Sequence, residues 1–255
     1  MLTYTTTGQA SEQPAVILVH GLFGSGRNLG GIARRLDQGR QVVSVDMRNH
    51  GDSFHSDEHD YPALADDLAQ VIAAHGGQAD VVGHSMGGKA SMTLALTRPE
   101  MVRRLAVLDI APLRYGHSQN DLIDAMEALD LHDLTLRSEA DRRLAARIDE
   151  PGVRAFLLQS LDLKSQPPRW KMNLTALRRN MDRLTGWPQG LPTGSFHGPA
   201  LFLAGAQSDY CPSEGVDAIR RYFPQAEVSF LEGAGHWLHA EKPQETGDAL
   251  AAFLS

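Results

Sequence analysis

The pentapeptide GHSMG at residues 83–87 constrains the fold of this chain more than any other segment. It follows the short strand-like run 80–82 and opens a run of helix-forming residues, 87–97. A serine in so tight a strand-to-helix turn is expected to adopt a strained, left-handed backbone, where side chains two residues away would collide with the strand or the helix. The two glycines remove those side chains. The pattern therefore predicts that Ser85 is a nucleophile at the start of a helix.

The bulk composition narrows the class of protein. A length of 255 residues suits one α/β domain of the larger kind, with room for an insertion. A hydrophobic fraction of 42% and a charged fraction of 22% are ordinary for a globular protein in water. The formal net charge of −7 argues against a nucleic-acid partner, because phosphate binding needs a basic surface.

The cellular compartment is suggested by two features of the sequence. The single cysteine, Cys211, excludes an intrachain disulfide and is compatible with a reducing environment. The first seven residues lack the basic start and apolar core of a secretion signal, and no apolar run approaches the length of a membrane span. We therefore expect a cytoplasmic protein without a membrane segment.

Apolar, β-branched runs alternate with amphipathic segments over most of the chain. This alternation predicts an α/β fold in which a mostly parallel central sheet is flanked by helices. Reactive groups are then expected just beyond the carboxyl ends of the strands. The predicted strands are 16–19, 42–45, 80–82, 105–108, 200–203 and 227–231, and the predicted helices are 25–36, 61–74, 87–97, 213–222 and 243–254.

The interval 113–199 breaks this alternation, because it contains no run typical of a buried strand. A Ser-x-x-Asp pattern from Ser138 resembles a capping box, and Pro151 suits the first position of a helix. We predict that residues 113–199 form a helical cap, or lid, inserted into an α/β core made of 1–112 and 200–255. The helices expected in the cap are 118–130, 138–149, 151–160 and 174–184.

A serine hydroxyl needs a general base, and His236 is the best candidate among 11 histidines. It follows the last predicted strand within the glycine-rich segment 232–237, and its place after Ser85 in the chain is the order found in α/β-hydrolases. His84 is expected to point away from the pocket of the serine. The other histidines are too dispersed to predict a metal site.

The base in turn needs an acid that fixes its tautomer. Asp109 and Asp209 follow neighbouring predicted strands, and the residues alone leave both open. The oxyanion of the intermediate needs two backbone N–H donors, for which we predict Leu22 and Met86. The polar loop after the strand 42–45 contains Asp46 and Arg48, which we expect to form a structural ion pair.

Five longer strings carry a family resemblance: HGLFGS, VDMRNHG, GHSMGGK, DIAP and AGAGHWLHAEKP. With them the chain resembles the α/β-hydrolase superfamily along nearly its whole length, and most of all the YbfF-type carboxylesterase group. The resemblance implies an esterase for acyl esters or thioesters with a helical cap and a Ser–His–Asp triad. It also implies that the acid is Asp109, at the DIAP strand end. Asp209 departs from that group, whose members typically lack an aspartate there.

The function expected from these features is hydrolysis of a small-molecule carboxylic ester through an acyl-enzyme on Ser85. We predict no cofactor or metal and no nucleic-acid or membrane partner. Carbon–carbon hydrolysis, perhydrolysis and lyase chemistry are alternatives on the same scaffold. A ligand receptor that uses the pocket under the cap is an alternative of another class.

Overall fold

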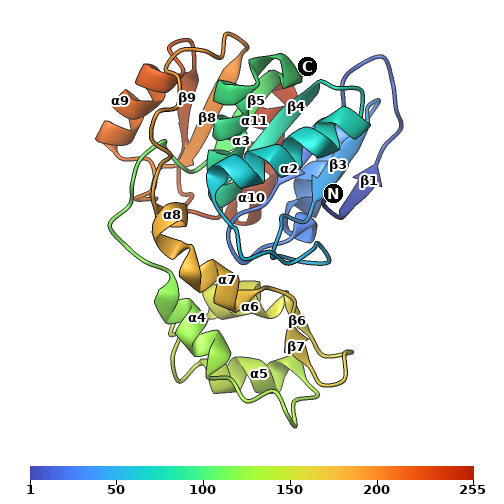
Figure 1. Ribbon diagram of the computed structural model, residues 1–255, viewed down its shortest axis with the longest axis vertical. Helices are drawn as coiled ribbons and strands as arrows, with labels where there is room; N and C mark the ends of the chain where they lie inside the picture. The colour runs from blue at the N-terminus through green and yellow to red at the C-terminus, as the bar shows by residue number, and fades with distance from the viewer.

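The computed structural model describes residues 1–255 and has a seven-stranded sheet at its centre (Figure 1). The strand order is β1-β3-β2-β4-β5-β8-β9, and all neighbours run parallel except β1, which is antiparallel to β3. The predicted fold class is therefore confirmed. The strands are β1 (Tyr4–Thr7), β2 (Val16–Val19), β3 (Val42–Val45), β4 (Ala79–His84), β5 (Val102–Leu108), β8 (Ala200–Gly205) and β9 (Glu227–Leu231).

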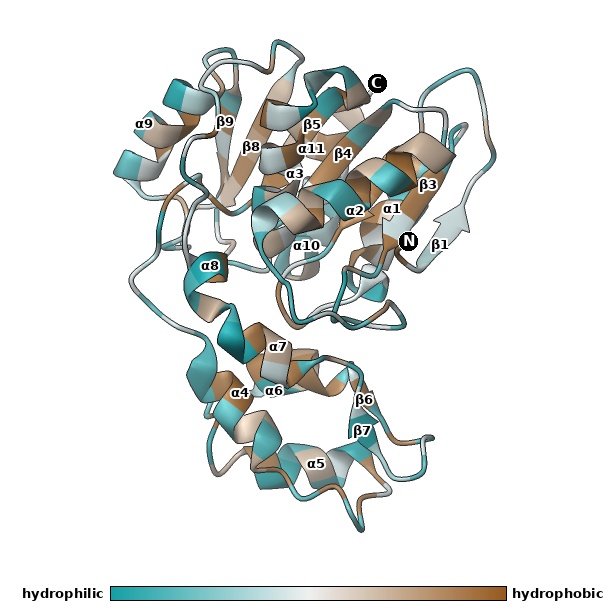
Figure 2. Cartoon of the chain, viewed as in Figure 1, coloured by the Kyte–Doolittle hydropathy of each residue, from teal (hydrophilic) through white to brown (hydrophobic).

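The central strands are buried on both faces, and their hydrophobic side chains alternate between two clusters. Ile17 and Val19 of β2 belong to one cluster, whereas Val16 and Leu18 belong to the other. Figure 2 shows this as hydrophobic colour concentrated in the sheet strands. Parallel strands buried in this way are continuous hydrophobic runs, which explains why the sequence identified them.

Helices cover both faces of the sheet (Figure 1). No helix has both the length and the hydrophobicity that a membrane span requires. One face packs against α2 (Tyr61–Ala74), α3 (Met86–Thr97) and α9 (Ser213–Tyr222). The other packs against α1 (Gly30–Leu36), α10 (Leu238–Glu241) and α11 (Pro243–Phe253), while the short 3₁₀ helices η1 (Gly26–Leu29) and η2 (Pro99–Met101) lie in connections.

Residues 113–199, called here the helical insertion, leave the sheet after β5 and return to it at β8 (Figure 1). Their helices bury one apolar face each, and Ile123, Leu144, Leu157 and Leu177 are fully buried there. The elements are α4 (Asn120–Glu127), α5 (Arg137–Leu144), α6 (Pro151–Leu158), α7 (Leu174–Arg179) and α8 (Met181–Thr185), with the hairpin β6 (Leu161–Asp162) and β7 (Arg169–Trp170).

Three local predictions differ from the structure. The predicted capping box is wrong, because α5 begins before Ser138 and no side chain caps its first turn. The helix predicted over 174–184 is split at Asn180 into α7 and α8. Strand β1 was missed because it is a polar, largely exposed edge strand with the sequence YTTT. The expected helix start at Pro151 is confirmed.

Candidate active site

Ser85 occupies the turn between β4 and α3 with φ of 52° and ψ of −117°. This is the predicted left-handed conformation, and a non-glycine residue adopts it only where the surroundings enforce it. A Cβ at Gly83 would overlap the carbonyl oxygen of Gly87, and a Cβ at Gly87 would overlap that of Val19. The two glycines thus let β2, β4 and α3 approach closely enough to hold the serine in place.

The structure brings Ser85, His236 and Asp109 into one hydrogen-bonded chain. The Nε2 atom of His236 lies 3.1 Å from the Oγ of Ser85. On the other side of the ring, Nδ1 lies 2.7 Å from Oδ2 of Asp109 and donates its proton to that carboxylate. With Nδ1 protonated, Nε2 is free to accept the proton of the serine hydroxyl.

Asp109 is buried, with 1% of its surface exposed, and two further groups fix its carboxylate. The N–H of Gly205 donates to Oδ1 at 2.8 Å, and the hydroxyl of Ser208 donates to Oδ2 beside His236. The backbone of Asp109 has φ of 50°, a second strained position in the site. Asp209, the other candidate acid, is exposed and lies four residues beyond the end of β8. The structure does not bring Asp209 to His236.

Two more side chains hold His236, and the sequence analysis missed both roles. The ring of Tyr210 stacks on the imidazole, with centroids 3.9 Å apart and an interplanar angle of 21°. The Nε2–H of His84 donates to the backbone carbonyl of His236 at 2.9 Å. The expectation that His84 points away from the pocket is wrong, because its ring lies 4.9 Å from the ring of His236 and the residue lines the same cavity as Ser85. Burial keeps the pKa of His84 well below its usual value, so the ring is neutral.

The two predicted oxyanion donors, Leu22 and Met86, lie at the cavity that contains Ser85. Met86 is the first residue of α3, so its N–H belongs to the unpaired amides of a helix start. The N–H of Leu22 makes no hydrogen bond within the chain. Both residues line the cavity that contains Ser85.

A pair of buried histidines holds the loop that carries Leu22. His20 donates from Nδ1 to the carbonyl of Gly21 at 2.7 Å, and the N–H of Phe23 donates to Nε2 of His50 at 3.1 Å. Burial lowers the pKa of His20 to about 4 and that of His50 to about 3. Both rings are therefore neutral near pH 7, which leaves the Nε2 of His50 able to accept a hydrogen bond.

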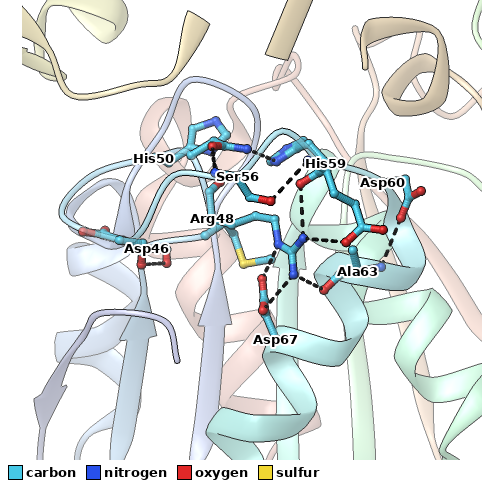
Figure 3. A network of polar contacts seen from close by, with 12 residues as sticks. Asp46, Arg48, His50, Ser56, His59, Asp60, Ala63 and Asp67 are labelled. Carbon is cyan, nitrogen blue, oxygen red and sulfur yellow. Dashed lines mark hydrogen bonds and ion pairs between the residues drawn. The ribbon is translucent and has the colours of Figure 1, made fainter. Parts of the chain in front are cut away.

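The expected ion pair between Asp46 and Arg48 is wrong, as Figure 3 shows. Arg48 points toward α2, where its guanidinium forms a two-pronged pair with Asp67 at 2.6 and 3.0 Å. A second carboxylate, that of Glu58, lies 3.4 Å from the guanidinium of Arg48. The carboxylate of Asp46 instead accepts the N–H groups of Gly26 and Asp52. Asp46 therefore joins its own loop to the segment that begins at Gly26, whereas Arg48 joins the same loop to α2.

A cavity of about 360 Å³ opens above Ser85, and most of the residues that line it are hydrophobic. The core contributes Ser85 and His236 to one wall. The helical insertion contributes a second wall, which includes Val153, Phe156 and Met181. An apolar group attached to the reacting carbon of a substrate could therefore enter between the two parts of the chain.

Comparisons with known proteins agree with this geometry. A sequence model described as the alpha/beta hydrolase fold matches residues 14–243. The sn-1-specific diacylglycerol lipase ABHD11 of Mus musculus is 39% identical over 263 residues, which cover 100% of this chain and 85% of the relative. Esterase YbfF of Escherichia coli strain K12 is 36% identical over 253 residues, covering 98% and 96%. A solved structure described as a marine microorganism esterase has a TM-score of 0.93 and 35% identity, covering 99% and 98%.

Proposed function

The chain belongs to the α/β-hydrolase family and is close to the YbfF-type esterases, and on this premise we propose that it hydrolyses carboxylic esters through an acyl-enzyme on Ser85. The observation that carries the proposal is the unbroken hydrogen-bonded chain from Ser85 through His236 to Asp109. Such a chain can move a proton away from a hydroxyl while a nucleophile forms. The relatives named as a lipase and an esterase support the same chemistry.

The first half of the proposed reaction makes the acyl-enzyme. His236 takes the proton of Ser85 at Nε2 while Oγ attacks the carbonyl carbon of the ester. The N–H groups of Leu22 and Met86 donate to the oxyanion that forms, and Asp109 stabilises the imidazolium. His236 then gives the proton to the departing alkoxide, and the carbon–oxygen bond breaks. An alcohol leaves, or a thiol if the substrate is a thioester.

The second half reverses these roles for water. His236 takes a proton from water as the hydroxide attacks the acyl carbon, and then returns that proton to Ser85 as the acid leaves. We propose that residues 113–199 form a cap over the core of 1–112 and 200–255, and that the acyl group lies under this cap. The cytoplasmic location expected from the sequence remains a prediction.

The test of this proposal is the variant Ser85→Ala assayed on p-nitrophenyl esters. Because the nucleophile is lost, we expect kcat to fall by at least about 10³-fold. The matched control is Ser213→Ala, since Ser213 is an exposed serine at the start of α9. Circular dichroism would establish that both variants fold. An unchanged rate in Ser85→Ala would overturn the proposal.

Labelling with a fluorophosphonate distinguishes the alternatives. The enzyme is expected to label once per chain at Ser85 and to turn over esters many times. Labelling without turnover of any ester would favour a receptor or another chemistry of the same scaffold. Those alternatives have no observation in the structure that favours them over ester hydrolysis.

A further inference from the structure

The structure contains a buried lysine that the proposed reaction does not use. Lys89 lies one turn after Ser85 on α3, and only 1% of its surface is exposed. No carboxylate forms an ion pair with it, unlike the buried Arg48. An isolated buried charge is costly, and a methionine of similar size would pack there without that cost. A lysine at this position therefore calls for a specific explanation.

All three protons of the ammonium point to backbone carbonyls of the helical insertion. Nζ lies 2.7 Å from the oxygen of Leu113, 2.6 Å from that of Gly186 and 3.2 Å from that of Thr185. Leu113 begins the insertion, whereas Thr185 ends α8 and Gly186 begins the other connection, which leads to β8. In Figure 1 both connections run between the sheet and the helices of the helical insertion. A single side chain on the nucleophile helix thus binds both connections.

Two tyrosines surround the ammonium and bind the same segments. Nζ lies 4.6 Å from the ring centroid of Tyr115 and 5.6 Å from that of Tyr61, within the range of cation–π attraction. The hydroxyl of Tyr61 donates to the carbonyl of Leu184 at 2.5 Å. The N–H of Tyr115 donates to the carbonyl of Thr185 at 2.9 Å and joins the two connections directly.

The ammonium is held by carbonyl dipoles and ring faces rather than by a counter-ion. Burial, with a smaller contribution from Arg114, lowers the pKa of Lys89 to about 7. The three carbonyls favour the charged form, because an ammonium can donate a hydrogen bond to each of them, whereas a neutral amine has only two N–H groups to donate.

The same residues form part of the cavity wall. Tyr61, Lys89, Tyr115, Leu184 and Thr185 all line the cavity above Ser85. The position of both connections therefore sets the distance between the wall built by the insertion and the wall built by the core. A shift of about 1 Å in such a wall is enough to change substrate positioning strongly.

We propose that Lys89 is a positioning residue that fixes both connections of the helical insertion to the nucleophile helix and thereby determines which acyl groups the cavity accepts. The proposal rests on the proposed ester hydrolysis, because it assigns the cavity to the acyl group. A short acyl group touches mainly the core wall, so Lys89 acts through the insertion mostly on long acyl groups.

The test is Lys89→Met, assayed on p-nitrophenyl esters from acetate to decanoate. We expect the ratio of kcat/KM for octanoate to that for acetate to fall at least tenfold, mainly through KM. The matched control is Lys171→Met. Lys171 also joins the insertion to the core, through a partly exposed ion pair with Asp52. We expect the octanoate-to-acetate ratio of Lys171→Met to differ from that of the parent by less than twofold.

Hydrogen exchange provides a readout that does not depend on activity. In Lys89→Met, backbone amides in 113–115 and 185–187 are expected to exchange at least tenfold faster, while those of β4 and β5 are unchanged. If the parent protein hydrolysed no ester, the proposed function would fail. Hydrogen exchange would still test whether Lys89 fixes the two connections to α3.

Two results would overturn the role of Lys89. One is an unchanged chain-length ratio together with unchanged exchange at both connections. The other is an equal loss of kcat on every ester with a lower Tm, which indicates a merely structural lysine. If Lys89→Met does not fold, Tyr61→Phe removes the bond to Leu184 and is expected to lower the same ratio about threefold. An unchanged ratio in that variant would also contradict the proposal.

Discussion

The two walls of the active-site cavity come from parts of the chain that are built differently. On the core wall, Ser85 and His236 follow the ends of β4 and β9 and are joined to each other by a hydrogen bond. Asp109 follows β5 and holds His236, while the N–H of Gly205 donates to its carboxylate. On the insertion wall, side chains such as Val153 and Phe156 are held by packing alone. The core wall therefore provides groups whose positions are exact enough for chemistry, whereas the insertion wall provides a shape.

The largest expected effect concerns Asp109, the acid bonded to His236 of the core wall. Asp109→Asn should lower kcat/KM by about 10⁴-fold, because an amide would favour the wrong tautomer of His236. Asp209→Asn should change it less than twofold, since Asp209 is exposed, whereas the carboxylate of Asp109 is bonded to the imidazole of His236. Steady-state kinetics of the two variants on one ester provides the measurement. A greater loss of kcat/KM in Asp209→Asn than in Asp109→Asn would indicate that Asp209 is the acid that orients His236.

The next effect concerns acid stability of the core. Burial lowers the pKa of His20 to about 4, of His50 to about 3 and of His59 to about 2, whereas the histidines of the insertion, such as His117, are exposed. Between pH 6.5 and 4 the unfolded chain binds protons that the folded core excludes, so the free energy of unfolding falls as the pH falls. For His20 alone the loss is on the order of 3 kcal/mol.

Urea denaturation at pH 7 and pH 5, with hydrogen exchange at both values, checks that prediction. Exchange should accelerate first in the loops that hold His20 and His50. Equal free energies of unfolding at the two pH values would contradict the prediction. So would faster exchange confined to the insertion, because the buried histidines lie in the core.

A smaller effect is expected from Ser208, which donates a hydrogen bond to the carboxylate of Asp109. Ser208→Ala should lower kcat by about tenfold, because one bond that orients the acid is lost while the amide of Gly205 still donates to it. Rates for Ser208→Ala and Ser213→Ala, compared on one ester, measure the effect. Equal rates would mean that Gly205 and His236 suffice to orient the acid.

The smallest effect concerns the insertion wall. Phe156→Ala removes a ring from the cavity and should raise the preference for longer acyl groups by about fivefold, with kcat on acetate nearly unchanged. Leu136→Ala is the control, since that side chain is 62% exposed on the same insertion. Chain-length profiles of the two variants provide the comparison. A loss of kcat on every ester in Phe156→Ala would indicate that the insertion wall takes part in the chemical step and does more than shape the cavity.

The core could be predicted from the sequence because its determinants are local. Hydrophobic runs mark the buried strands, and two glycines mark the strained turn at Ser85. The residues alone did not separate Asp109 from Asp209, because both follow neighbouring strands. In the structure, Asp109 comes directly after β5 and is bonded to His236, whereas Asp209 lies in an exposed loop beyond β8.

Contacts between distant segments could not be predicted in the same way. Arg48 pairs with Asp67 because α2 packs across the loop, and Tyr210 reaches His236 because the loop after β8 folds back over the ring. The connections of the insertion meet at Lys89, although Leu113 and Thr185 are 72 positions apart in the chain. Such pairings depend on tertiary packing and leave no periodic signal in the sequence.

The account depends most on an acyl group bound covalently to Ser85. The direct measurement is rapid quenching of the reaction with p-nitrophenyl butyrate, followed by mass spectrometry of the intact chain and of the peptide that contains Ser85. We expect a butyryl adduct on Ser85 that appears with the burst of nitrophenol and is absent in Ser85→Ala. Turnover of the ester without any adduct, or with the adduct on another residue, would contradict the account.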